Sequence, residues 1–141
     1  MSHYNVKKLE MKGDRQGRLI ALEAKRDVSF DIKRVYYIFG TENGVARGFH
    51  AHRELEQFLI CVSGSCSIVM DDGSTRDSVL LDSPDKGLYI GPMKWHEMHE
   101  LTTSTVLLVL ASDWYRESDY IRDYGQFFAL AEKQKSEAER C

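Results

Sequence analysis

The sequence predicts an all-β domain, an antiparallel sandwich or barrel of short strands, followed by a C-terminal helix. Short stretches of β-branched, aromatic and other apolar residues recur along most of the chain, and turn residues separate them. From about residue 117 the spacing of the apolar residues becomes helical. The expected strands cover residues 19–22, 34–39, 57–62, 65–70, 78–81, 87–90 and 105–110.

Turn signals mark where the expected strands end. They lie at residues 41–44, 63–64, 71–73 and 83–85, and Asp72-Gly73 is typical of a tight hairpin connection. Such short strands bury one face and need neighbours to cover their edges, which favours a sandwich or barrel. Residues 106–110 are apolar on both faces, so we expect this strand in the centre of a sheet.

The C-terminal helix is expected over about residues 117–138. Aromatic and small residues recur there at helical spacing, namely Tyr120, Tyr124, Phe127, Phe128 and Ala131. Gly125 should weaken the helix. We interpret the aromatic stripe as a face that packs against the β domain or against a partner subunit.

Length and composition predict one domain, residues 1–141, with its β part over about 6–112. Apolar residues make up 43% and charged residues 29%, and no run approaches the roughly 20 apolar residues of a membrane helix. The first residues show no secretion signal, so we expect a soluble, cytoplasmic protein. Cys61, Cys66 and Cys141 lack a zinc or disulfide spacing, which favours reduced thiols. A net charge of -3 gives no general attraction to nucleic acid or acidic lipid.

The strongest functional signal is a pair of histidines, His50 and His52, beside Arg47. Residues two apart on a strand point to the same side, so both imidazoles are expected to enter one cavity. A lone histidine is usually a structural residue. Two at this spacing, next to a glycine-bounded arginine, indicate a functional site.

Residues 44–64 resemble the first cupin motif: a glycine, five residues, His-x-His, three or four residues, an acid, and a glycine farther on. The acid position is held here by the neutral Gln57. Residues 87–96 resemble the second motif, which makes His96 the candidate third histidine. The resemblance implies a cupin jelly-roll barrel.

In a metal cupin, imidazoles and a carboxylate hold the ion, and an amide is a poor replacement for the carboxylate. Gln57 therefore favours a site without metal, although Glu56 can replace it if the local turn brings it inward. If residues 95–99 are extended, His99 faces away from His96 and is a surface or supporting residue.

Several segments in order resemble the dTDP-4-oxo-6-deoxyglucose 3,4-ketoisomerases: residues 30–39, 47–52, 87–92, 95–98, 109–113 and 119–124. The similarity runs from about residue 6 to residue 127. It implies a homodimer with no required metal or other cofactor. It also implies conversion of a dTDP-linked 4-keto-6-deoxyglucose into its 3-keto isomer, from which a 3-amino sugar of a lipopolysaccharide or S-layer glycan is built.

The chemistry of this reaction suggests roles for the candidate residues. A proton on the carbon beside a ketone is acidic, because its removal places negative charge on the carbonyl oxygen. Histidine, with a pKa near 6.5, can take and return this proton near neutral pH. We expect His52 to be the base at sugar C3, with His50 supporting or sharing proton transfer. Tyr36 is expected to polarise the sugar oxygens or shuttle protons between them. Arg47 can donate two hydrogen bonds to the pyrophosphate.

Further substrate contacts are expected from five residues: His96, Arg34, Gln16, Gln57 and Tyr89. With a histidine at position 96, the sequence resembles the members of the family that form the galacto product, so dTDP-3-oxo-6-deoxygalactose is favoured. Gln16 departs from the arginine or tyrosine of other members.

Three alternatives stay open at this point. One is an enzyme like the dTDP-sugar 3,5-epimerases, which exchange hydrogen at C5 as well as C3. Another is a metal-dependent cupin acting on a free small molecule. The third is a non-catalytic, sugar-sensing cupin module, although no DNA-binding helix-turn-helix segment fits in this chain.

Overall fold

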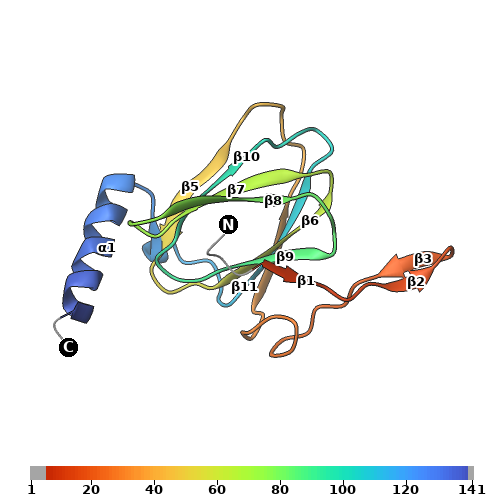
Figure 1. Cartoon of the computed structure of the whole chain (residues 1–141), viewed down its shortest axis with the longest axis horizontal. Coiled ribbons are helices and arrows are strands. Elements are labelled where there is room, and N and C mark those ends of the chain that lie inside the picture. Colours follow the sequence, from red (N-terminus) through yellow and green to blue (C-terminus); the bar gives the residue numbers. More distant parts are fainter. Residues whose placement is uncertain (1–5, 140–141) are drawn as a thin grey trace.

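The computed structural model describes residues 6–139 and shows two facing five-stranded sheets, a projecting hairpin and a C-terminal helix (Figure 1). One sheet has the order β1-β9-β6-β11-β4, and the other has the order β12-β5-β10-β7-β8. The strands are β1 (Val6–Lys8), β2 (Lys12–Asp14), β3 (Gly17–Leu19), β4 (Arg34–Ile38), β5 (Arg47–His52), β6 (Gln57–Ser63), β7 (Cys66–Asp71), β8 (Arg76–Leu81), β9 (Lys86–Ile90), β10 (Trp95–His99), β11 (Val106–Ala111) and β12 (Tyr120–Ile121).

The predicted all-β fold with a terminal helix is confirmed, and its strands pair antiparallel. The two large sheets do not close into a hydrogen-bonded barrel within residues 6–139, because each keeps two free edges. The architecture is therefore a jelly-roll sandwich. No helix in this range is both long and apolar enough to cross a membrane.

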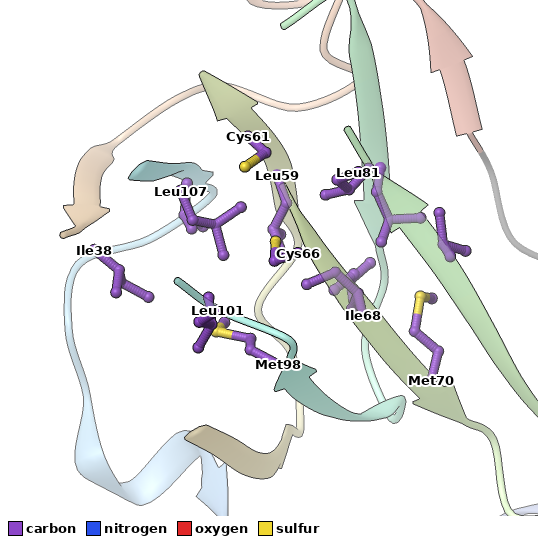
Figure 2. Packing of buried hydrophobic residues seen from close by; sticks show 14 residues of the cluster. Ile38, Leu59, Cys61, Cys66, Ile68, Met70, Leu81, Met98, Leu101 and Leu107 are labelled. Atoms are coloured by element: carbon purple, nitrogen blue, oxygen red, sulfur yellow. The ribbon is translucent and has the colours of Figure 1, made fainter. Parts of the chain in front are cut away.

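The main core lies between the two sheets (Figure 2). Leu59 and Cys61 of β6 and Leu107 of β11 face Ile68 of β7 across this space, and all four are buried. The other side of β6 is also covered, because Phe58 and Ile60 pack with the chain segment that precedes β4. Both faces of β6 and β11 are thus apolar, and the expected interior position of β11 is confirmed. Cys61 and Cys66 are free and buried, whereas Cys141 lies outside the described residues.

The N-terminal strand prediction is largely wrong. β3 ends at Leu19, and residues 20–22 pair with no strand. Ile20 and Leu22 instead pack as partly buried side chains against the cluster beside β6. Apolar contact without a neighbouring strand explains why a β-like stretch is irregular here. The β2–β3 hairpin is exposed throughout and projects on the side opposite the C-terminal helix (Figure 1).

The predicted helix begins too early. Residues Glu117–Asp119 form a 3₁₀ turn, Tyr120–Ile121 form β12, and helix α1 covers Tyr124–Glu139. Asp123 starts α1, because its carboxylate accepts the backbone N–H of Gln126 at 2.9 Å. Phe127 and Ala131 are buried against β5 and β10, so the packing-face prediction is confirmed for these two.

The hairpin prediction at Asp72-Gly73 is confirmed. Residues 72–75 connect β7 to β8, and the Asp72 carboxylate accepts the backbone N–H groups of Ser74 and Thr75 at 2.8 Å. Gly73 has a φ of +93°, which residues with a side chain rarely adopt.

Candidate active site

Three histidines meet on the inner side of the β5–β10 pair. His50 and His52 come from alternate positions of β5, and His96 of β10 lies directly opposite His50 in the strand register. The ring centroid of His50 is 4.9 Å from that of His52 and 4.5 Å from that of His96. Two-residue periodicity and antiparallel pairing together bring the expected imidazoles into one cluster.

A β-bulge in β5 brings Arg47 to the same cavity. The register against β10 shifts between His96 and Glu97, and Phe49 is the extra residue, with a φ of 54°. In a regular strand, residues 47 and 50 would face opposite sides, but the bulge places Arg47 and His50 on one wall. Gly48 permits this bend, since it has a φ of +98° and a Cβ there would lie 3.3 Å from the carbonyl oxygen of His96.

The hydrogen bonds of the three rings define their tautomers. The Nδ1 atoms of His50 and His96 face the carbonyl oxygens of Gly48 and Lys94, at 3.0 and 3.2 Å. Nδ1 of His52 lies 3.2 Å from a carboxylate oxygen of Asp119. Each neutral ring therefore donates from Nδ1 and keeps a lone pair on Nε2. Within residues 6–139 no group hydrogen-bonds to these three buried Nε2 atoms.

Burial keeps the three histidines neutral. It lowers the pKa of His50, and it is the largest cause that lowers the pKa of His52 and of His96 to about 3. Positive charge on a neighbouring ring of the cluster lowers the pKa of His52 and His96 further. Around neutral pH each imidazole is consequently a base with a free lone pair.

A cavity of about 420 Å³ opens beside the cluster. Of the three histidines only His50 lines it, since the exposed fractions of His52 and His96 are 3% and 1%. His52 is the base predicted from the sequence, whereas of the two β5 histidines His50 is the one that lines this cavity. The lining residues are Arg34, Tyr36, Ile38, Arg47, Gly48, His50, Met98, Tyr115, Tyr120 and Arg122.

The cavity wall is positively charged. It carries Arg34, Arg47 and Arg122, and none of its lining residues is acidic. Arg122 is paired with Glu117 at 3.0 Å, whereas Arg47 has no ion pair among the described residues and Nε of Arg34 is buried without a partner there. Guanidinium groups in this state are suited to bind phosphate oxygens.

Tyr36 faces the cavity from β4, as expected. Its hydroxyl oxygen accepts a hydrogen bond from Nε2 of Gln57 at 2.9 Å. Burial, followed by the nearby Tyr120, raises the pKa of Tyr36 to about 12. The hydroxyl therefore keeps its proton near neutral pH and can donate it to an oxygen of a bound molecule. Gln57 itself is buried behind Tyr36.

Two expected contacts lie elsewhere. The Tyr89 hydroxyl donates to Glu56 at 2.7 Å, and Glu56 lines a separate cavity of about 370 Å³ that contains no histidine. Gln16 lies at the turn of the projecting β2–β3 hairpin. Neither Tyr89 nor Gln16 lines the histidine cavity of its own chain. His99 points away from His96, and its Nε2 is 2.8 Å from Glu97.

The identity of the chain follows from comparison with known proteins. The model of the FdtA family, described as WxcM-like, C-terminal, matches residues 2–132. A TDP-4-oxo-6-deoxy-alpha-D-glucose-3,4-oxoisomerase from Aneurinibacillus thermoaerophilus is 53% identical over 114 residues, which are 81% of this chain and 82% of that protein. The chain belongs to the 3,4-ketoisomerase family. The family predicted from the sequence, and with it the expectation of an isomerase, is confirmed.

Solved structures of 3,4-ketoisomerases share the same fold. One from Helicobacter canadensis is 45% identical, with a TM-score of 0.90, over 94% of this chain and 99% of that chain. A mutant of QdtA from Thermoanaerobacterium thermosaccharolyticum, in complex with TDP-4-keto-6-deoxyglucose, is 42% identical, with a TM-score of 0.90, over 94% of this chain and 97% of that chain.

In this ketoisomerase the segment before α1 supplies site residues that the sequence prediction missed. Tyr115, Tyr120 and Arg122 line the cavity, and Asp119 contacts His52. Tyr120 fitted a helical stripe by its spacing, which concealed its position on a strand. The signal that could have separated it is Asp123, whose side chain is well suited to begin a helix.

The histidine cluster also offers a set of metal ligands. One nitrogen from each of His50, His52 and His96 lies within 4.8 Å of the others. A tetrahedral zinc site with bonds of about 2.0–2.1 Å needs closer nitrogens, so the cluster would have to contract to hold zinc. The nearby acid position holds Gln57, whose buried Oε1 has no partner among the described residues. The donors can hold a divalent ion but bring no negative charge, and the metal-free site stays a prediction.

Proposed function

We propose that this chain converts TDP-4-oxo-6-deoxyglucose into its 3-oxo isomer. The observation that carries the proposal is the position of His50: a neutral base with a free Nε2 lone pair lies on the wall of a cavity lined by three arginines. The choice of substrate is supported by two relatives: one that is 53% identical is named for this nucleotide sugar, and one that is 42% identical was solved in complex with it.

Arg47 and Arg34 are proposed to bind the pyrophosphate. Both line the cavity, and neither is neutralised by a carboxylate among the described residues. A bound pyrophosphate would accept charge-assisted hydrogen bonds from the unpartnered Nε of Arg34 and from the guanidinium of Arg47. The sugar would then extend toward His50 and Tyr36.

His50 is proposed to remove the proton from sugar C3. The electron pair moves toward the C4 carbonyl oxygen, where the Tyr36 hydroxyl stabilises the developing negative charge by a hydrogen bond. His52 supports His50 from behind: it packs against the His50 ring and is held by Asp119. The reaction is proposed to proceed without a metal ion or other cofactor.

The favoured product is dTDP-3-oxo-6-deoxygalactose, a precursor for a 3-amino sugar. His96, on which this preference rests, is buried against His50 and does not line the cavity. We propose that it acts through the position of His50. An arginine in its place would bring a charge and a longer side chain to the back of the base.

A cytoplasmic homodimer is proposed as the working form. Val35 and Tyr37 on β4 and Phe39 directly after it leave an exposed apolar row, which a second subunit can cover. Because the hairpin with Gln16 projects away from its own domain, a contact between Gln16 and substrate would come from the second subunit (Figure 1). Tyr89 lies outside this cavity with its hydroxyl bonded to Glu56, and its contact with substrate stays a prediction.

The test is incubation with TDP-4-oxo-6-deoxyglucose in deuterium oxide, followed by NMR of the nucleotide sugar. The proposal predicts a 3-oxo isomer that carries deuterium at C4. Deuterium at C5 would show epimerase chemistry instead. Recovery of unlabelled substrate would exclude catalysis on this sugar.

A further inference from the structure

Tyr120 occupies the point where the cavity, the histidine cluster and the C-terminal segment meet. It lies on β12, which pairs with β5 so that Tyr120 is opposite His52. Its ring centroid is 5.0 Å from that of His50 and 4.4 Å from that of His52. Tyr120 also lines the cavity beside His50.

The backbone around Tyr120 is firmly held. The carboxylate of Asp119 accepts the N–H groups of Glu54 and Leu55, at 2.9 and 3.3 Å, and Ile121 is buried in the core beneath α1. The Arg122 guanidinium lies 4.2 Å from the centre of the Tyr120 ring. The contacts of the residues before and after Tyr120 in the sequence therefore fix the position of its ring.

The Tyr120 hydroxyl, by contrast, makes no hydrogen bond with any residue in the described range 6–139. The Tyr36 hydroxyl differs, because it is already bonded to Gln57. A fixed ring with a free hydroxyl on the cavity wall is available to exchange a proton with a bound molecule.

The proposed isomerisation also needs a group that delivers a proton to C4. His50 takes a proton from C3, and Tyr36 acts at the sugar oxygens, but a proton must also reach C4. In the galacto product, the new C4 hydrogen lies on the same face of the ring as the C3 hydrogen that was removed. The donor must therefore lie on the same side of the sugar as His50, where both the His50 imidazolium and the Tyr120 hydroxyl are found.

We propose that Tyr120 donates the proton to C4, an inference that rests on the proposed function. The C3–H bond breaks, its proton passes to Nε2 of His50, and its electron pair forms the C3–C4 double bond of an enediolate. The O3–H proton then moves to O4, the electrons return to make the C3 carbonyl, and C4 takes the proton of the Tyr120 hydroxyl. The tyrosinate recovers a proton from the imidazolium of His50, so the enzyme ends unchanged.

The test compares two rates in deuterium oxide for the Tyr120→Phe variant. One is exchange of the C3 hydrogen in recovered substrate, and the other is formation of the 3-oxo isomer. Without the donor, His50 can still remove and return hydrogen at C3, while delivery to C4 fails. We expect isomer formation to fall by about 100-fold and the ratio of exchange to isomer formation to rise by at least about tenfold.

Tyr124→Phe is the matched control, because Tyr124 lies on α1 outside the cavity and its hydroxyl donates to Asp71; its ratio should equal that of the wild type. The ratio is independent of the amount of folded enzyme, since both rates scale with it. An unchanged ratio in Tyr120→Phe, including an equal loss of both rates, would overturn the role of Tyr120. A wild-type protein that neither exchanges nor isomerises the sugar would overturn the proposed function itself.

Discussion

Replacing His50 with asparagine removes the one histidine of residues 6–139 that lines the arginine-rich cavity. His52 and His96 cannot take its place, since their exposed fractions are 3% and 1%. General-base catalysis contributes about 10²–10⁴-fold, so kcat should fall by about 100-fold or more, which corresponds to about 2.7 kcal/mol in the activation free energy. Binding of TDP should persist, because Arg34 and Arg47 remain in the cavity.

The assay for His50→Asn is the initial rate of 3-oxo isomer formation by NMR, with TDP affinity measured by calorimetry. His99→Asn is the matched control: it is the same substitution on the adjacent strand, at a ring that points toward Glu97. Its kcat should stay within about threefold of the wild type. If His50→Asn retained wild-type kcat while His52→Asn lost about 100-fold, His52 would be the base and our interpretation of the cavity would be wrong.

Three further predictions concern pH, phosphate binding and metal. Burial lowers the pKa of His96 from 6.5 to about 3, so between these pH values His96 binds a proton more readily in the unfolded chain than in the folded one, and the free energy of unfolding should decrease as pH falls through this window. Thermal unfolding of His96→Gln should show a shallower decrease, and a pH dependence identical to that of the wild type would contradict this prediction. Arg47→Ala should weaken TDP binding by about tenfold or more in calorimetry, with the exposed Arg53→Ala as control, whereas an unchanged affinity would exclude the phosphate contact. Exhaustive chelation should leave kcat unchanged, and activity restored by one divalent ion would show a metal enzyme.

Sequence periodicity was sufficient to predict that His50 and His52 lie together, whereas His96 was predicted from the second cupin motif. His50 and His52 share a strand face by simple alternation, and His96 joins them because β10 pairs with β5. The same alternation does not predict Arg47 on the wall of the histidine cavity. On a regular strand it would face away from His50, and the bulge at Phe49 that corrects this depends on backbone angles that the residue type does not favour.

The contributions of distant segments could not be predicted from local pattern. Tyr120 repeats with Tyr124 and Phe127 at helical spacing, yet pairing with β5 makes its segment a strand. Tyr89 contacts Glu56 because β9 pairs with β6, the strand that Glu56 directly precedes, and neither residue reveals this pairing in the sequence. The projection of the hairpin that carries Gln16 likewise depends on tertiary structure (Figure 1). In each case, contacts between segments far apart in the chain determined the outcome.

The most direct test of the central claim, proton removal at C3 in the arginine-lined cavity, is turnover of TDP-4-oxo-6-deoxyglucose that carries deuterium at C3. We predict a 3-oxo isomer, with deuterium lost from C3 and a lower initial rate than for unlabelled substrate. A nucleotide sugar recovered with its C3 deuterium intact, after incubation with folded enzyme that binds TDP, would contradict the account.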